Sequence, residues 1–243
     1  ALLDRLSFRR FCGFALDGGT PDETTLCRFR LAAAQAGVLE ACFAEIGAQL
    51  SAKGLILKKG TLLDATIIQA THAAPSREAG LGQGHPREPG ADWGKKNGKA
   101  HFGYKLHVGV DEGSGLIRTA VVTSARVQDV EMAPGLVTGD EAAVYADRGY
   151  ESKAHRAALK AGGVKDRIMH RRHKHIAALP RWLQRRNALI ARRRAPVEAV
   201  FSAMKRLYGK ARTRCHSLAA NTADLIAFAT VYNLRRATII AGG

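Results

Sequence analysis

The sequence predicts an α/β fold, in which a mixed sheet is flanked by helices and preceded by an N-terminal helical region. Three observations lead to this prediction. Residues 1 to 57 carry apolar side chains at helical spacing, with glycines between the segments. Short apolar runs bounded by turn-forming residues, typical of strands, begin at residue 60. From residue 142 onward, strand-like and helix-like segments alternate.

Three helices are expected in the N-terminal region. The first covers residues 4–14, and the third covers residues 38–52. The second should begin with Thr20 as N-cap, Pro21 in the first position and Glu23 closing a capping box, and should stop before Gly37. Such helices suit a DNA-binding helix-turn-helix or, equally, a packing or dimerisation module. Because the chain begins in helix-like sequence, we expect the natural protein to start further upstream.

The later segments give the order of the sheet. A long loop rich in Gly, Pro and charge is expected over 74–100, and Asp129 should cap the helix that it begins. The expected elements are strands over 60–70, 101–110, 116–124, 142–147 and 166–169, and helices over 129–137, 152–160, 183–208 and 218–240. This is the order of an RNase H-like mixed sheet. We therefore expect a helical region at 1–57 and an RNase H-like catalytic domain at 58–243.

Positive charge is concentrated in one part of the chain. The net charge is +17, and residues 148–214 contain 20 Lys and Arg against 3 Asp and Glu, while the remainder has 18 of each sign. A localised excess of this kind favours a surface for a polyanion, and we interpret it as a nucleic-acid surface. No apolar stretch approaches the length of a membrane span, and the first residues do not form a signal peptide.

Three acidic residues point to the chemistry. Asp64 lies within an apolar strand, Asp147 ends another, and Glu198 lies in a basic helix. A carboxylate in a buried strand is costly unless it is paired or binds a metal ion. Three of them on strand, strand and helix suggest a site in which two Mg²⁺ ions assist cleavage of a phosphodiester.

Each acid also has a structural interpretation. Asp64 is alternatively a satisfied core aspartate, and Asp147 a cap for the turn at Arg148. Glu198 is alternatively the partner of Arg194 in a surface pair four residues apart. The helix that carries Glu198 should dock on the sheet through an apolar stripe formed by Val197, Val200, Phe201, Met204 and Leu207.

Five segments in a fixed order carry a family resemblance. They are residues 60–68, 95–107, 123–129, 145–150 and 194–201, and residues 6–11, 21–30 and 233–236 add to them. In these segments the chain resembles the DDE transposases of the insertion-sequence-5 group, which are related to the insertion-sequence-4 group. The pattern Arg194-x3-Glu198-x6-Lys205 matches the related group, but Ala191 stands where that group has tyrosine.

The resemblance implies a function and a site. Asp64, Asp147 and Glu198 would be the catalytic residues and the ligands of two Mg²⁺ or Mn²⁺ ions. The activity would be hydrolysis at transposon ends followed by strand transfer of the 3′-hydroxyl into target DNA. The partners would be transposon-end and target DNA, bound by a homodimer or higher oligomer in the cytoplasm, at the nucleoid. The expected DNA contacts are Lys105, His107, Arg148, Arg193, Arg194 and Lys205.

Two alternatives remain open at this point. The same metal site would serve an RNase H-like nuclease or resolvase, which cuts without joining. A domesticated, non-catalytic DNA-binding protein would have the basic surface without a complete set of acids. For Lys105 and His107, a structural role on their strand is as well supported as contact with the scissile phosphate.

Overall fold

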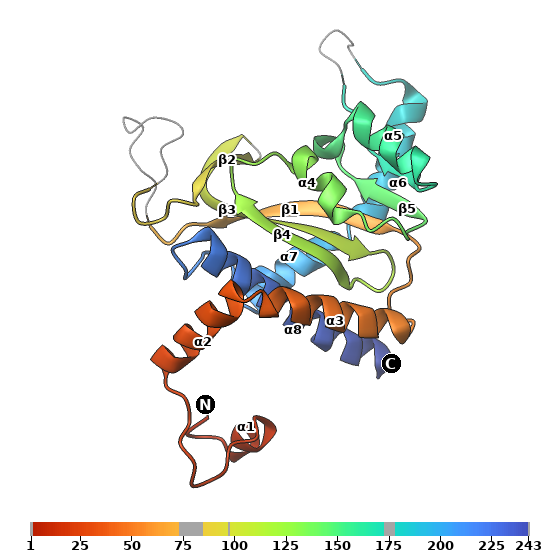
Figure 1. The fold of residues 1–243 in the computed structure, drawn as a ribbon. Coiled ribbons are helices and arrows are strands. Elements are labelled where there is room, and N and C mark those ends of the chain that lie inside the picture. The colour runs from red at the N-terminus through yellow and green to blue at the C-terminus, as the bar shows by residue number, and fades with distance from the viewer. Residues whose placement is uncertain (1, 73–84, 97, 173–177, 243) are drawn as a thin grey trace.

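The structure is a computed structural model that describes residues 2–72, 85–96, 98–172 and 178–242. A central sheet has helices on both faces, and a helical arm extends from its lower side (Figure 1). The strands are β1 (Thr61–Gln69), β2 (Asp92–Lys96), β3 (Lys99–Asp111), β4 (Ile117–Ser124), β5 (Ala143–Ala146) and β6 (Lys165–Ile168). The helices are α1 (Leu6–Phe11), α2 (Glu23–Gln35), α3 (Val38–Ala52), α4 (Asp129–Leu136), α5 (Lys153–Ala161), α6 (Arg181–Arg194), α7 (Val197–Arg206) and α8 (Leu218–Ala241), with a short 3₁₀ turn η2 (Arg148–Tyr150).

The sheet is mixed, as the sequence predicts, and contains one strand, β2, more than the five that were expected. Its six strands follow the order β2-β3-β1-β5-β6, and β4 also pairs with β3. Strands β2 and β4 share one edge of β3, because β2 pairs with its first part as far as Gly103 and β4 pairs from Tyr104 onward. The β1–β3 pair is antiparallel, whereas β1–β5 and β5–β6 are parallel. The RNase H-like α/β fold class is therefore confirmed.

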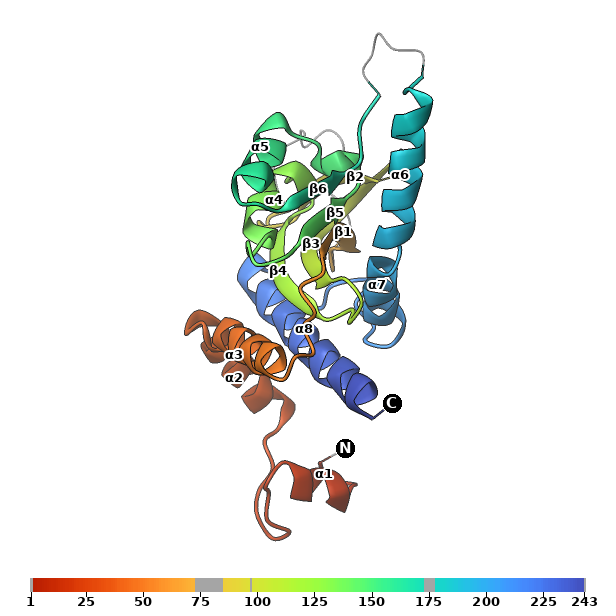
Figure 2. The ribbon, with the colours of Figure 1, turned by 90° about the vertical axis from the view of Figure 1, so that its right-hand side faces the viewer.

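Two apolar layers hold the helices against the sheet. One face packs against α7 and α8, and its buried cluster includes Leu62, Leu106, Val200 and Phe228. The other face packs against α4 and α5, with Leu63 and Leu159 in its cluster. Figure 2 shows α4 and α5 on one side of the strands and α6 and α7 on the other. Because side chains alternate along a strand, Asp64 shares a face with Leu62, the face that α7 covers.

The helix expected over 183–208 is two helices. Helix α6 ends at Arg194, and α7 starts at Val197 after Ala195 and Pro196. Proline lacks the N–H that a continuing helix needs and clashes with the preceding turn, so the first helix ends here and a second one begins. Of the predicted apolar stripe, Val197, Val200, Phe201 and Met204 are buried, but Leu207 is 61% exposed.

Local details differ from the sequence predictions at three further places. Asp22, not Thr20, caps α2, and its carboxylate accepts the N–H of Thr25 at 2.6 Å. Gln128, not Asp129, caps α4, in a capping box with Glu131. Part of the long loop expected over 74–100 is strand β2, whereas residues 73–84 and 97 of that loop lie outside the described part of the chain.

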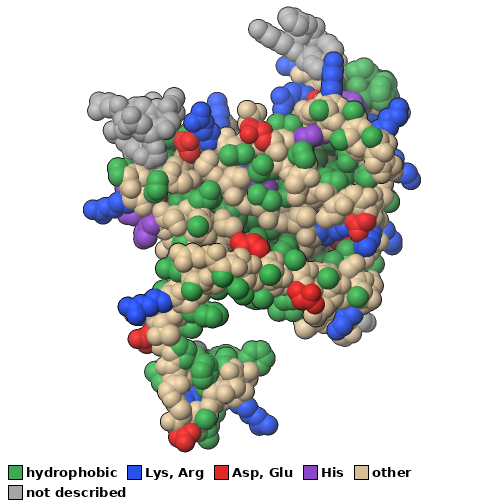
Figure 3. All heavy atoms as spheres, in the orientation of Figure 1, with side chains coloured by type: hydrophobic (Ala, Val, Ile, Leu, Met, Phe, Trp, Pro, Cys, Tyr) green, Lys and Arg blue, Asp and Glu red, His purple; other side chains and the backbone are tan. Residues whose placement is uncertain are grey.

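The N-terminal helices form an arm that leads to the sheet. Helix α3 lies beside α8, and the guanidinium of Arg30 on α2 forms an ion pair with Asp224 of α8 (Figure 1). Helix α1 projects away from the body and exposes apolar side chains, including Phe11 at 89% (Figure 3). Within the described ranges, no single helix has the length and apolar character needed to cross a membrane, although α2 and α3 meet both criteria as a bent pair.

Candidate active site

The three predicted acids line one groove. Strand β1 supplies Asp64, the residue after β5 is Asp147, and the first turn of α7 supplies Glu198. The parallel register pairs Leu62 with Tyr145, so Asp64 and Asp147 each lie two residues beyond a paired position, and both line the groove. The groove has a volume of about 530 Å³, and its other charged side chains are Asp129, Lys95, Lys96, Lys105, Arg194 and Lys205.

Asp64 is paired with a basic residue from the neighbouring helix. Nη1 of Arg194 donates to Oδ2 of Asp64 at 2.6 Å, and the N–H of Ala65 donates to Oδ1 at 2.8 Å. Burial raises the pKa of Asp64, and the positive charge of Arg194 opposes this shift. Arg194 thus bonds to Asp64 rather than to Glu198 four residues on, because the chain turns at Pro196 between the two helices.

Asp147 and Glu198 keep carboxylate oxygens available. Oδ1 of Asp147 accepts the N–H of Gly149 at 2.7 Å, so this residue does cap the turn, but the bond occupies one oxygen only. The Glu198 side chain is exposed and has no hydrogen-bond or ion-pair partner among the residues that the structure describes. The capping role and the groove position of Asp147 are therefore compatible.

A fourth acid, Asp129, also lies in the groove, and the sequence had suggested only a capping role for it. Nζ of Lys105 donates to its Oδ1 at 3.0 Å, and Nδ1 of His107 lies 3.8 Å from the same oxygen. Alternation along β3 directs Lys105 and His107 to the face that α4 covers, where Asp129 begins the helix. One feature of the sequence pointed to Asp129: it is the last residue of the segment 123–129, which carries part of the family resemblance.

Tyr150 lies behind these acids. Its side chain is fully buried, and its hydroxyl has no hydrogen-bond partner in the described part of the chain. Burial raises the pKa of Tyr150 well above its usual range, and the negative charges of Asp129, Asp64 and Asp147 act in the same direction. The phenol thus stays protonated beside a concentration of negative charge.

The predicted DNA contacts separate into two sets. Lys105, Arg194 and Lys205 line the groove. Arg193 instead donates to Oε1 of Glu112 at 2.7 Å, and exposed Arg148 is not among the groove residues. His107 is fully buried, with Nε2 2.9 Å from Oγ1 of Thr123, which favours the structural role considered for it.

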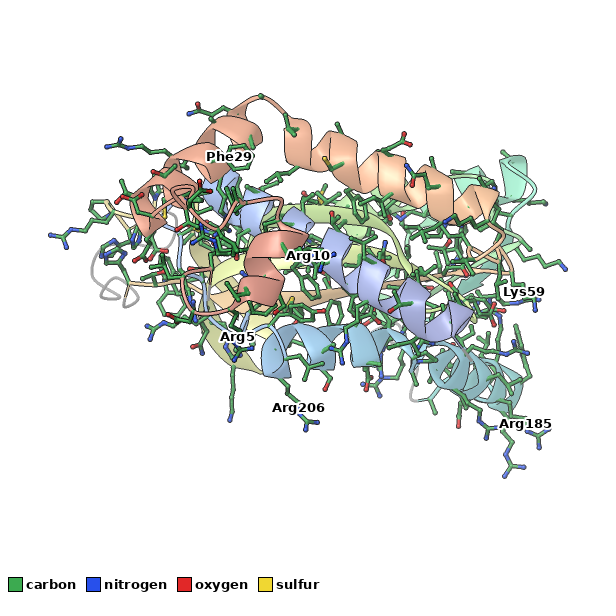
Figure 4. The ribbon with its side chains drawn as sticks, turned by 90° about the horizontal axis from the view of Figure 1, so that it is seen from below. Arg5, Arg10, Phe29, Lys59, Arg185 and Arg206 are labelled. Carbon is green, nitrogen blue, oxygen red and sulfur yellow. The ribbon has the colours of Figure 1, made fainter. Side chains whose placement is uncertain are left out.

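Two lysines of β2, Lys95 and Lys96, were missed as site residues. Both are exposed and line the groove, and Nζ of Lys96 donates to the carbonyl of Ala65 at 3.2 Å. Further positive charge extends along α6 and α7, where Arg185 and Arg206 point away from the body (Figure 4). Basic side chains are therefore present both in the groove and on the outer faces of α6 and α7.

Comparison with protein-family models identifies the family of the chain. A model described as Transposase DDE domain matches residues 57–234, and one described as Transposase domain (DUF772) matches residues 1–31. The chain belongs to the DDE transposase family. No solved structure was found to match this transposase. Membership makes it a DNA transposase and a nucleotidyl-transfer enzyme, in a family that generally uses divalent metal ions.

The donor atoms of the transposase groove suit a hard divalent cation. Four carboxylates are available, and Mg²⁺ and Mn²⁺ prefer oxygen ligands of this kind. Carboxylates that gather at one site repel each other unless positive charge neutralises them, and Arg194 provides such charge to Asp64. The residues present therefore fit the ions that the family uses.

Proposed function

We propose that this transposase cuts the phosphodiester bonds at the ends of an insertion sequence of the insertion-sequence-5 group and joins the freed 3′-hydroxyl to target DNA. The observation that carries this proposal is the meeting of Asp64, Asp147 and Glu198 in one lysine-rimmed groove. These residues come from β1, the end of β5 and α7, so only the folded sheet and its covering helix unite them.

Asp64, Asp147 and Glu198 would hold two divalent cations, Mg²⁺ or Mn²⁺. When bound, such ions lower the pKa of water and neutralise charge on the leaving oxygen of a phosphodiester. Glu198 and Asp147 offer unpaired oxygens for this task, while Asp64 would exchange its bond to Arg194 for an ion. The released guanidinium would then be free to pair with a phosphate of the bound DNA.

Basic side chains around the groove would hold the DNA backbone. Lys95, Lys96, Lys105 and Lys205 surround the acids, and phosphate contacts of this type position a duplex without reading its sequence. Asp129 holds Lys105 through a 3.0 Å bond and would thereby fix where that ammonium meets a phosphate. Because its substrate would be chromosomal DNA, the enzyme would act in the cytoplasm, at the nucleoid.

The chain would act as two regions in a homodimer or larger complex on DNA. The N-terminal region, 1–57, would serve dimerisation or DNA contact, and 58–243 would be the catalytic domain. The exposed apolar side chains of α1 support an assembly role for the first region. The ion pair between Arg30 and Asp224 supports a fixed attachment of α2 to α8.

The proposal is tested by amide variants of the three acids. Asp64→Asn, Asp147→Asn and Glu198→Gln should each lower Mg²⁺-dependent cleavage of end DNA by at least about a thousandfold, because an amide is a poor ligand for the cation. DNA affinity should stay within about threefold, since the lysines remain. Cleavage is measured on labelled end DNA and affinity by fluorescence anisotropy.

Glu45→Gln on α3 is the matched control, because this carboxylate is exposed, accepts a hydrogen bond from Gln49 and lies outside the groove. It should cleave at the wild-type rate. Full activity in any one of the three groove variants would remove that residue from the site. A strand-transfer assay separates the nuclease alternative: cut ends without a joined product would favour a nuclease or resolvase over the proposed joining activity.

A further inference from the structure

Three chain segments meet at a cluster of histidine and glutamate outside the catalytic groove. His72 follows β1, Glu88 precedes β2, and His216 precedes α8. One possible ligand atom from each residue lies within 4.8 Å of the others. None of the three lines the groove of Asp64, Asp147 and Glu198. The cluster is thus separate from the groove of the three acids.

Glu88 is the fixed centre of the cluster. Its side chain is fully buried, its Oε2 accepts the N–H of His72 at 2.6 Å, and its Oε1 accepts the N–H of Thr71 at 3.1 Å. Nδ1 of His72 lies 2.9 Å from Oε2. A buried carboxylate is costly without a positive charge nearby. The hydrogen bonds to the backbone and to His72 offset part of this cost, and a bound cation would offset it further.

The imidazole rings are already gathered around one point. The ring centroids of His72 and His216 are 4.9 Å apart, and His85 stacks on His72 at the same distance. Two protonated histidines this close would repel each other. Neutral rings avoid this repulsion, and a cation bound between them would neutralise the charge of Glu88. Two imidazoles and a carboxylate form a donor set typical of Zn²⁺, whereas Mg²⁺ prefers oxygen ligands throughout.

We propose that His72, Glu88 and His216 bind one Zn²⁺ ion, with water in the remaining tetrahedral position. The ion would cross-link the end of β1, the entry to β2 and the segment before α8. Those segments already touch: Oγ1 of Thr71 bonds to the carbonyl of Thr213 at 3.0 Å. Because β2 carries Lys95 and Lys96 into the groove, zinc would hold that lysine pair in place.

The direct test is zinc binding to the full chain after removal of metal with EDTA. Titration with zinc chloride, followed by calorimetry and by metal analysis after dialysis, should give one tightly held Zn²⁺ per chain. His216→Gln should weaken binding by about tenfold or more, since a ligand is lost. His216 is exposed, so this variant should fold normally, whereas Glu88→Gln serves as a second variant in the buried position.

Two controls make the result specific. His101→Gln on β3 removes a histidine outside the cluster and should bind zinc as the wild type does. The double variant Asp147→Asn/Glu198→Gln should also retain its zinc, which separates this site from the catalytic acids. Zinc should be released on acidification toward about pH 5, because protons compete for the imidazoles. Failure of the wild type to bind zinc, or binding by His216→Gln as tight as the wild type, would overturn the proposal and leave a His72–Glu88 ion pair.

Discussion

At the scale of single residues, Asp64 meets the structural requirements of a paired core aspartate and of the proposed metal ligand. Its burial raises the pKa of its carboxyl, and the bond from Arg194 opposes that shift and holds the carboxylate toward the end of α6. A core aspartate needs a partner of this kind, while a metal ligand needs an accessible face on a cavity. Asp64 has both, because it lies where the apolar cluster of its sheet face gives way to the groove.

His107 gives the stability of the protein a pH dependence with a definite sign. Burial lowers the pKa of its imidazole from 6.5 to about 4, although Asp129 opposes the shift. Between these values the unfolded chain takes up a proton and the folded chain does not. Stability from this group is therefore full above about pH 6.5 and is lost as the pH falls toward about 4.

The corresponding prediction concerns His107→Gln. Between about pH 7 and about pH 4.5, the wild type should lose about 2.5 kcal/mol more unfolding free energy than the variant, from the cited pKa values. Chemical denaturation monitored by circular dichroism at both pH values measures the difference. An equal loss in the two proteins would mean that His107 titrates normally in the folded state.

At the scale of elements, the break between α6 and α7 positions Glu198. A continuous helix over this stretch was expected from its apolar periodicity, which Pro196 does not disturb. The break lets Arg194 meet Asp64 from the end of one helix and Glu198 face the groove from the start of the next. The position of Glu198 thus depends on a helix break that apolar periodicity alone does not reveal.

Close approach of β1 and β3 depends on a glycine. Gly103 has φ +155°, and a Cβ built there would lie 2.1 Å from the carbonyl oxygen of Ile68. Gly103→Ala should therefore lower the unfolding free energy by more than about 2 kcal/mol, because backbone atoms have to move. Urea denaturation measures this loss.

Gly47→Ala is the matched comparison, because Gly47 lies within α3 and a Cβ there meets nothing within 4 Å. This variant should gain about 0.5–1 kcal/mol from helix propensity. A neutral Gly103→Ala would show that β1 and β3 separate without cost.

At the scale of the whole molecule, the fold determines where the positive charge of the chain lies. Part of the basic excess of residues 148–214 lies on α6 and α7 and reaches the surface of the groove through Arg194 and Lys205, whereas another part lies on α5 and β6. Lys95, Lys96 and Lys105 join this surface from the otherwise neutral remainder of the chain. The fold therefore brings basic side chains from sequence regions of different net charge together around the groove.

Salt dependence of DNA binding tests where the duplex lies. Arg185→Ala/Arg206→Ala removes two exposed arginines that point outward from α6 and α7 (Figure 4). If both contact phosphates, the slope of log affinity against log salt should become shallower by about 0.9 for each contact. Anisotropy titrations over a range of salt concentrations give the slope.

Arg10→Ala/Arg28→Ala on α1 and α2 is the paired control, and its slope should match the wild type. The opposite outcome, with the N-terminal pair changing the slope, would assign DNA contact to the helical arm. It would then favour the helix-turn-helix interpretation of this region over a packing or dimerisation module.

The sequence by itself determined the α/β class, five of the six strands, the three candidate acids and the basic character of the partner surface. Local periodicity and composition are enough for these features, because they reflect which side chains each element must bury. Only the tertiary structure decided that Arg194 pairs with Asp64, that Asp129 lies in the groove and that His72, Glu88 and His216 converge. These contacts join residues far apart in the chain, and no local pattern specifies a distance that the packing of sheet and helices sets.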